Sequence, residues 1–195
     1  MCGIAGQYCF LGLAPDRELL ERMSGQLIHR GPDGTGTEIR GCTGLVHRRL
    51  ATIDLSKDGL QPMTNEDKTL WLVYNGEIYN YIELRDELAG KGHHFRSQSD
   101  TEVILHLVAR SQKSRIVERY IDALRAIEGA YALVALTNKK LIGARDPFGI
   151  RPLILGELNG AYILCSETCA LDIIGAKFVR EIENGEVVVI SDEGV

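Results

Sequence analysis

Short apolar runs bounded by turn residues occur on both sides of a helical middle in this chain of 195 residues, and this pattern constrains the fold more than any other feature. Helical spacing of apolar residues predicts helices at residues 15–29, 79–88, 100–109 and 116–127. β-rich runs predict strands within residues 37–54, 69–74, 130–137, 141–144, 153–155, 161–165 and 187–190. Together they predict a single α+β domain over residues 1–195, a four-layer αββα sandwich of two stacked, mainly antiparallel sheets.

The composition excludes several classes of partner. A hydrophobic content of 45% is enough for a core, and 22 Lys and Arg against 27 Asp and Glu give a net charge of −5. Because the chain lacks a basic field, we expect no nucleic acid partner. No apolar run is long enough to cross a bilayer, and the N-terminus lacks the basic and then apolar order of a signal peptide. We therefore expect no membrane association and a cytoplasmic location.

The five cysteines, an odd number without an export signal, argue against a disulfide framework. Cys165 and Cys169 have no second cysteine or histidine pair at zinc spacing, and the histidines show no ligand spacing of their own. We expect no metal and no cofactor. The cysteines other than Cys2 are interpreted as small buried apolar residues, at positions 9, 42, 165 and 169.

Cys2 directly follows the initiator methionine, so removal of Met1 leaves one residue with both a thiol and a free α-amino group. An α-amino group titrates at about 7.7 to 8.0, so near neutral pH part of it is neutral and accepts the thiol proton. Taken without its neighbours, a cysteine at position 2 is more often a chance occurrence than a nucleophile. The small and apolar residues of MCGIAG favour a strand that tethers the terminus, which this chemistry needs.

Attack on an amide also needs hydrogen-bond donors aimed at the developing oxyanion. Asn75 and Gly76, at the end of the apolar run LWLVY, offer a side-chain N–H group and a backbone N–H group. The alternative interpretation is a plain hairpin turn, because Asn-Gly is a common turn sequence. Taken alone, the dipeptide favours the turn.

A free amino acid carries an α-carboxylate and an α-ammonium group, so its site needs a cation and a carboxylate. Arg48 or Arg49 and Asp100 are the candidates, although each taken alone is more often a solvated surface charge. Alternation along HRRLATID places Arg48 and Arg49 on opposite faces, so only one of them serves. The periodicity does not say which.

The segment HRGPDG ends the first predicted helix with a Pro-Asp-Gly turn that lets a loop fold over a neighbouring cleft. The simpler interpretation is a helix stop. His29, at its start, is a candidate base, but a histidine at a helix end is more often a dipole or hydrogen-bond partner, and we favour that role.

The first half of the chain, about residues 1–107, contains six motifs in this order: MCGIAG, HRGPDG, GLVHRRLATIDLS, QPM, NGEIYNYIELRDEL and FRSQSDTEVIL. Together these motifs resemble the glutaminase domain of asparagine synthetases. The resemblance implies a set of site residues: the nucleophile Cys2, the oxyanion-hole residues Asn75 and Gly76, the carboxylate clamp Arg49, and Asp100 with Glu77 for the α-amino group.

The second half contains a different series, which includes EGAYALVALTNKKLIGARDPFGIRPL and LCSETCALDIIG. This segment, about residues 123–195, resembles the glutaminase domain of amidophosphoribosyltransferases. Both families are class II glutamine amidotransferases, and the resemblance implies the αββα fold of N-terminal nucleophile hydrolases. We interpret the chain as a hybrid or chimera, or as a divergent relative that retains features of both families, and the resemblance changes between about residues 107 and 123.

The chain stops where either family begins its second catalytic domain, so we expect an acceptor or synthetase domain in trans, or a homo-oligomer, as partner. The catalytic set is expected to come wholly from the first half, and the second half is expected to form a sheet packed on the first. Mismatched side-chain volumes between two lineages predict only moderate stability.

The leading hypothesis is hydrolysis of L-glutamine to glutamate and ammonia through a thioester on Cys2. One alternative is a catalytically idle or regulatory module that binds glutamine. Another is an amide hydrolase of the same fold that acts on a penicillin or a bile-acid amide. Arg49 and Asp100 argue against the last alternative, because they match a zwitterionic amino acid.

Overall fold

The computed structural model describes the whole chain, residues 1–195. Its strands are β1 (Gly3–Tyr8), β2 (Gly34–Arg40), β3 (Thr43–Arg49), β4 (Met63–Thr64), β5 (Trp71–Ile78), β6 (Gly129–Leu136), β7 (Leu141–Arg145), β8 (Ile154–Leu158), β9 (Ala161–Cys165), β10 (Lys177–Glu181) and β11 (Val187–Ile190). Its helices are α1 (Arg17–Gln26), α2 (Tyr81–Gly90), α3 (Thr101–Arg110), α4 (Ile116–Ala126) and α5 (Thr168–Asp172), with a 3-10 turn, η1 (Lys57–Gly59).

Two antiparallel sheets form the centre of the molecule. The six-stranded sheet has the order β10-β8-β9-β1-β3-β2, and the five-stranded sheet has the order β11-β7-β6-β5-β4. Each sheet takes strands from both halves of the chain, since β9 pairs with β1 and β6 pairs with β5. The expectation that the second half forms a sheet of its own is therefore wrong, because apolar patterns predict where strands lie and not which strands pair.

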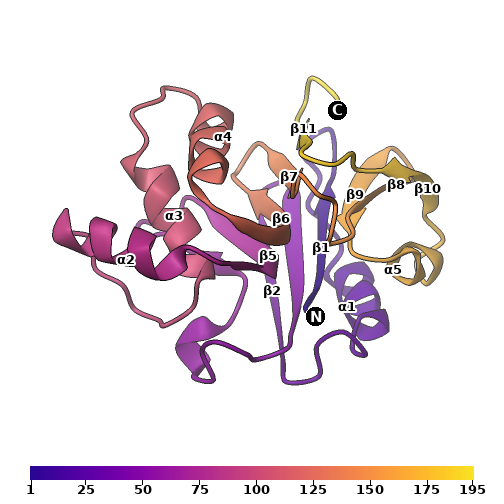
Figure 1. Cartoon of the computed structure of the whole chain (residues 1–195). Coiled ribbons are helices and arrows are strands. Elements are labelled where there is room, and N and C mark those ends of the chain that lie inside the picture. Colours follow the sequence, from indigo (N-terminus) through magenta and orange to yellow (C-terminus); the bar gives the residue numbers. More distant parts are fainter.

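Three apolar cores separate four layers (Figure 1). The core between the sheets contains Ile4, Leu45 and Val134. Helices α2, α3 and α4 cover the outer face of the five-stranded sheet, and α1 and α5 cover that of the six-stranded sheet. Each fully buried Leu or Ile side chain contributes about 1.5 to 3 kcal/mol, so these cores supply the main stabilising free energy. The predicted four-layer αββα sandwich is confirmed.

The helices begin and end near the residues that apolar periodicity predicts. Helix α1 begins after Asp16, whose side chain accepts a hydrogen bond from the Glu18 N–H group (2.8 Å) and caps the helix. Leu20 and Met23 lie on its buried face against the six-stranded sheet. Helix α3 is buried along most of its length because it packs against α2, α4 and the five-stranded sheet.

Some segments differ from the sequence prediction. The strands predicted within residues 37–54 end at Arg49, because β2 and β3 form a hairpin and a loop with η1 follows over residues 50–62. Strand β10 and helix α5 lie outside the predicted elements. Most residues of β10 are exposed at the edge of the sheet, so the strand lacks the alternation that would predict it.

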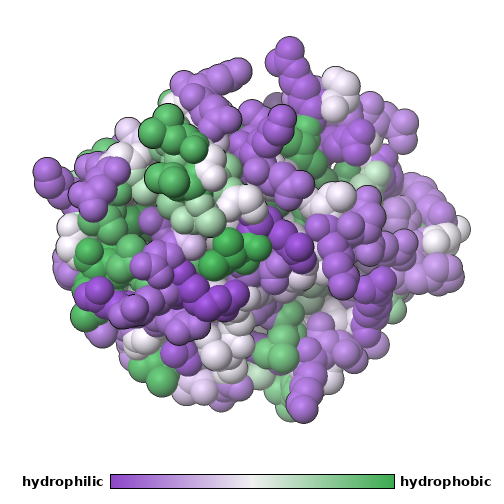
Figure 2. All heavy atoms as spheres, turned by 180° about the vertical axis from the view of Figure 1, so that it is seen from behind, coloured by the Kyte–Doolittle hydropathy of each residue, from purple (hydrophilic) through white to green (hydrophobic).

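None of the helices combines the length and the apolar character needed to cross a bilayer. Figure 2 shows that the face opposite to that of Figure 1 is mostly hydrophilic, with apolar residues in small separate groups. Apolar side chains therefore gather in the three cores rather than on this face.

Candidate active site

Cys2 lies directly before β1, at the end of the chain marked N in Figure 1. β1 pairs with β3 on one side, where Gly3 is opposite Arg48, and with β9 on the other. This double pairing tethers the terminus inside the sheet, as the MCGIAG sequence predicts.

The Cys2 sulfur contacts the segment that follows β3. The Leu50 N–H group donates to Cys2 Sγ (3.4 Å), and Sγ lies 3.7 Å from the Leu50 carbonyl oxygen. Burial raises the pKa of the Cys2 thiol, although the Leu50 hydrogen bond and the charges of the N-terminus and Arg49 act in the opposite direction. The thiol is therefore protonated near neutral pH, and it needs a base before it attacks an amide.

An ion pair holds the Cys2 backbone. Arg30 Nε donates to the Cys2 carbonyl oxygen (2.9 Å), and the buried Arg30 guanidinium also pairs with Glu167, 137 residues further along the chain. His29 Nε2 lies 2.8 Å from Glu167 Oε2, which confirms the favoured role of His29 as a hydrogen-bond partner. The sequence analysis missed Arg30 and Glu167 as site residues, because no local pattern links positions so far apart.

Alternation along β3 separates Arg48 from Arg49. Arg48 Nε donates to a carbonyl oxygen of α1 (3.0 Å). Arg49 is buried on the opposite face, where its guanidinium donates to the carbonyl oxygens of Ser56 (2.7 Å) and Asp54. Arg49 therefore lines the pocket at the Cys2 sulfur, and Arg48 does not.

The HRGPDG turn supports the segment that carries Arg49. The Asp33 N–H group donates to the Arg49 carbonyl oxygen (2.9 Å), and Asp33 Oδ2 accepts from the Ala51 N–H group (2.9 Å). A Cβ atom at Gly31 would lie 2.4 Å from the Arg48 carbonyl oxygen, so this close approach requires glycine. The turn therefore braces the loop that follows β3.

Asp100 directly precedes α3 and lines the same pocket. Its Oδ2 atom accepts a hydrogen bond from the Ile78 N–H group (2.9 Å). Burial raises the pKa of Asp100, and the nearby charge of Glu77 adds to this, against the lowering effect of backbone hydrogen bonds. Glu77 itself is exposed and does not line the pocket. A buried carboxylate of this kind is stabilised by a cationic partner such as an ammonium group.

Asn75 and Gly76 lie inside β5, opposite Ala132 and Tyr131 of β6. The hairpin-turn interpretation of this dipeptide is therefore wrong. A Cβ atom at Gly76 would lie 2.5 Å from the Ala130 carbonyl oxygen, so only glycine fits beside β6. Gly76 lines the pocket. The Asn75 Nδ2 atom is buried without a hydrogen-bond partner, so it is a donor that an acceptor group would satisfy.

The pocket at the Cys2 sulfur, called the Cys2 pocket below, has a volume of about 40 Å³. It is lined by residues from the start of β1, the end of β3, the loop that follows, β5 and the start of α3, among them Cys2, Arg49, Asp54, Gly76, Ser99 and Asp100. The fold thus brings a nucleophile, a cation and a carboxylate together from separate elements. Gly76 belongs to this lining, whereas its neighbours in β5, Asn75 and Glu77, do not.

No three His, Cys, Asp or Glu side chains are grouped so that they could hold a metal ion. All five cysteines are free thiols. Cys42 and Cys165 are buried, as interpreted from the sequence, but Cys9 and Cys169 are only partly buried. The interpretation was wrong for these two because Cys9 follows the last residue of β1 and Cys169 lies in the short surface helix α5.

The sequence matches the family described as the glutamine amidotransferase domain over residues 1–191. The chain belongs to this family. Among the relatives of this amidotransferase domain, the amidophosphoribosyltransferase of Rhizobium etli is 46% identical over 158 residues, which cover 80% of this chain and 32% of the relative. The amidophosphoribosyltransferase of Bacillus subtilis is 35% identical over 189 residues, which cover 94% of this chain and 40% of the relative.

Solved structures also resemble this amidotransferase domain. The glutamine phosphoribosylpyrophosphate amidotransferase of B. subtilis, in complex with ADP and GMP, has a TM-score of 0.88 and 30% identity, and the match covers 99% of this chain and 48% of that chain. A glutamine aminotransferase class-II domain protein of Silicibacter pomeroyi, with a TM-score of 0.58, 12% identity and coverage of 98% and 88%, shows the fold alone. The predicted membership in the class II glutamine amidotransferases is confirmed.

This amidotransferase domain spans about a third to two fifths of the length of the two curated relatives. The B. subtilis enzyme matches along nearly the whole chain, including the half for which the sequence motifs predict a resemblance to asparagine synthetases. The change of resemblance between residues 107 and 123 stays a prediction.

Proposed function

We propose that this amidotransferase domain hydrolyses the side-chain amide of L-glutamine with Cys2 as the nucleophile. The observation that carries the proposal is the convergence of the Cys2 thiol, the Arg49 guanidinium and the Asp100 carboxylate in one small pocket. Arg49 matches the α-carboxylate of a free amino acid, and Asp100 matches its α-ammonium group. Glu77 adds a second negative charge near Asp100, which favours the ammonium group further.

The chemistry begins when removal of Met1 turns the Cys2 nitrogen into an α-amine. The amine takes the thiol proton, and Sγ attacks the side-chain carbonyl carbon of glutamine. We assign the Asn75 side-chain amide and the Gly76 N–H group as donors to the oxyanion that forms. The ammonium group then passes its proton to the amide nitrogen, the C–N bond breaks, and ammonia leaves a thioester on Cys2. Water adds to the thioester, which releases glutamate and restores the thiol.

We expect substrate entry to involve movement. The Cys2 pocket, at about 40 Å³, is much smaller than the roughly 300 Å³ or more of a typical ligand pocket. The loop of residues 50–62 contributes Asp54 and Gly59 to the wall of the pocket. We expect this loop to open for glutamine and to close during the reaction.

The fate of the ammonia belongs to the same proposal. Since this domain spans less than half of each amidophosphoribosyltransferase named above, we propose that ammonia passes to an acceptor domain, either in a longer form of the protein or in trans. The names of these relatives favour a phosphoribosyl acceptor, whereas the motifs of residues 1–107 favour a synthetase acceptor of the asparagine synthetase type. We place this reaction in the cytoplasm, and a homo-oligomer is an alternative form of the partner.

The test is incubation of the protein with glutamine, read for glutamate and ammonia in equal amounts. Intact mass first establishes that Met1 has been removed. An N-terminally extended variant, in which Cys2 keeps its peptide bond, should lose most of the activity because an amide nitrogen cannot act as the base. Binding of glutamine by the processed protein without any turnover would contradict the proposal and favour the idle binding module.

A further inference from the structure

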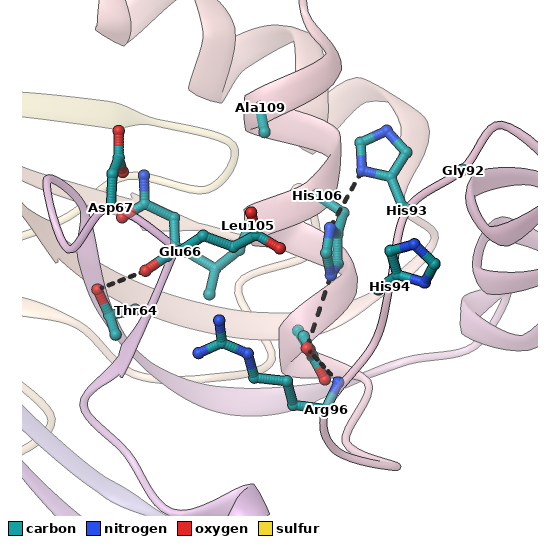
Figure 3. Close-up of a pocket in the computed structure, with 12 residues that line it drawn as sticks. Thr64, Glu66, Asp67, Gly92, His93, His94, Arg96, Leu105, His106 and Ala109 are labelled. Carbon is teal, nitrogen blue, oxygen red and sulfur yellow. Dashed lines mark hydrogen bonds and ion pairs between the residues drawn. The ribbon is translucent and has the colours of Figure 1, made fainter.

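The loop at residues 96–100, between α2 and α3, contributes to two separate cavities. Its last residues, Ser99 and Asp100, line the Cys2 pocket. Its first residue, Arg96, lines a second cavity of about 470 Å³, called the histidine cavity below because His93 and His106 form part of its wall (Figure 3). The position of Asp100 therefore depends on what holds this loop from the side of the histidine cavity.

Glu102 holds the start of this loop. It lies in the first turn of α3 and is buried, although the loop and the histidine cavity are close to the surface. Its Oε1 atom accepts from the Arg96 N–H group (2.8 Å), and its Oε2 atom accepts from the Ser97 N–H group (2.8 Å) and the Ser97 hydroxyl (2.7 Å). Ser97 Oγ in turn accepts from the Ser99 N–H group (3.2 Å), so the contact with Glu102 extends toward the Cys2 pocket.

Histidines of the cavity hold Glu102 from its other side. His106 Nε2 lies 3.6 Å from Glu102 Oε1, one helical turn further along α3. His93 Nδ1 and His106 Nδ1 are 3.1 Å apart, and Figure 3 shows the two rings joined by this hydrogen bond. The Glu102 carboxylate is thus fixed by groups from its own helix and from the loop.

The middle and the end of the loop, Gln98 and Asp100, are held by residues on the side of the Cys2 pocket. Asp54 Oδ2 accepts from the Gln98 N–H group (2.7 Å), and the Asp54 carbonyl oxygen accepts from Arg49. Asp100 Oδ2 accepts from the Ile78 N–H group (2.9 Å). Arg85 Nη2 donates to the Ser97 carbonyl oxygen (2.7 Å), so Ser97 is held by two residues, Glu102 and Arg85, neither of which lines the Cys2 pocket.

We propose that Glu102 is a positioning residue for the glutamine site, which it serves by holding Arg96 and Ser97 so that Ser99 and Asp100 face the Cys2 pocket. This inference rests on the proposed glutaminase function. A displacement of about 1 Å in a positioned group reduces catalytic efficiency by up to about a hundredfold, so a contact outside the pocket is able to control the reaction. Because Asp100 meets the unreacting end of glutamine, the effect falls on substrate binding rather than on the chemical step.

The experiment compares Glu102→Gln with the wild type in steady-state glutamine hydrolysis. We expect KM for glutamine to rise by about tenfold or more, because the neutral amide cannot accept all three hydrogen bonds, while kcat changes by less than about threefold. The rate at which iodoacetamide alkylates Cys2 should stay unchanged. Glu118→Gln is the matched control, since Glu118 is an exposed residue of α4, and its KM should equal that of the wild type.

Ser97→Ala is the second variant, and it decides the question if Glu102→Gln does not fold. It removes one of the three donors to Glu102, so its KM should rise in the same direction by a smaller factor. The double variant should show the KM of Glu102→Gln alone, because both changes release the same loop. A lower melting temperature with KM and kcat unchanged would overturn the inference and leave Glu102 a structural residue. If the wild type itself hydrolyses no glutamine, the proposed function fails, and the inference fails with it.

Discussion

The Cys2 pocket and the histidine cavity share one loop but differ in size and in the kind of side chain that lines them. The Cys2 pocket holds about 40 Å³ and contains the buried ionic residues Arg49 and Asp100. The histidine cavity holds about 470 Å³ and contains the exposed side chains of His94 and Arg96. In the Cys2 pocket the charged groups come from separate elements and line the same space as a thiol, whereas in the histidine cavity His93 and His106 bind each other.

This difference teaches that volume is a poor guide to the reactive site in this fold. Burying a charge costs free energy unless the charge is paired, so buried ionic side chains that converge on a nucleophile indicate a functional demand. The exposed His94 beside the larger cavity carries no such cost. The comparison predicts large effects of substitution at the Cys2 pocket and graded, smaller effects toward the histidine cavity.

The largest effect is expected for Cys2→Ala, which should reduce glutamine hydrolysis by roughly a thousandfold or more because no other thiol lines the pocket. Thermal unfolding should be nearly unchanged, since Cys2 precedes the strand pairing of β1. Cys9→Ala is the control and should keep full activity. Ammonia release measures both variants, and wild-type turnover by Cys2→Ala would disprove the nucleophile assignment.

Asn75→Ala should lower kcat by about a hundredfold with little change in KM, because its Nδ2 donor is needed only when the oxyanion forms. The exposed Asn138, replaced by alanine, is the matched control. Steady-state kinetics over a range of glutamine concentrations separate the two constants. A change confined to KM would remove Asn75 from the oxyanion hole.

Glu102 should stabilise the fold in a pH-dependent way. Burial by itself raises the pKa of this carboxyl, but the nearby His106 ring (3.6 Å) and hydrogen bonds from Ser97 and Arg96 outweigh it and lower the pKa from 4.5 to about 2. A lowered pKa in the folded state gives stability that is present above 4.5 and is lost as the pH falls toward about 2, roughly 3 kcal/mol at most.

The free energy of unfolding of Glu102→Gln should therefore lie below that of the wild type at neutral pH, and the two should approach each other between pH 4.5 and about 2. Urea denaturation at a series of pH values measures this difference. The free energy of unfolding of the control, Glu118→Gln, should stay equal to that of the wild type over the same pH range. A constant gap at every pH would mean that the carboxylate charge has no part in holding the loop.

The smallest effect is expected for His94→Gln, in the wall of the histidine cavity. His94 is exposed, so its replacement should change the free energy of unfolding by less than about 0.5 kcal/mol and leave kcat and KM for glutamine unchanged. A rise in KM would show that the histidine cavity is part of the substrate site, and the comparison would no longer hold.

Local sequence patterns predicted much of this molecule. Apolar periodicity located α1 to α4, and the terminal position of Cys2 followed from its place after Met1. The residues that line the Cys2 pocket all precede position 107, in agreement with a catalytic set from the first half. Glu167, which pairs with Arg30 behind Cys2, nevertheless comes from the second half. Support for the site is therefore shared between the two halves.

Propensity and periodicity act over a few residues. The sequence by itself therefore determined which chemical groups are present and which neighbouring side chains lie on opposite faces of a strand. It established that Arg48 and Arg49 point to opposite faces but not which face is buried in the Cys2 pocket. The family resemblance selected Arg49, and the tertiary structure places Arg49 in the Cys2 pocket. Only the tertiary structure decided the place of Asn75 inside β5 and the pairing of Arg30 with Glu167. These relations depend on which strands pair and which layers pack, and contacts between distant residues leave no signal in a local pattern.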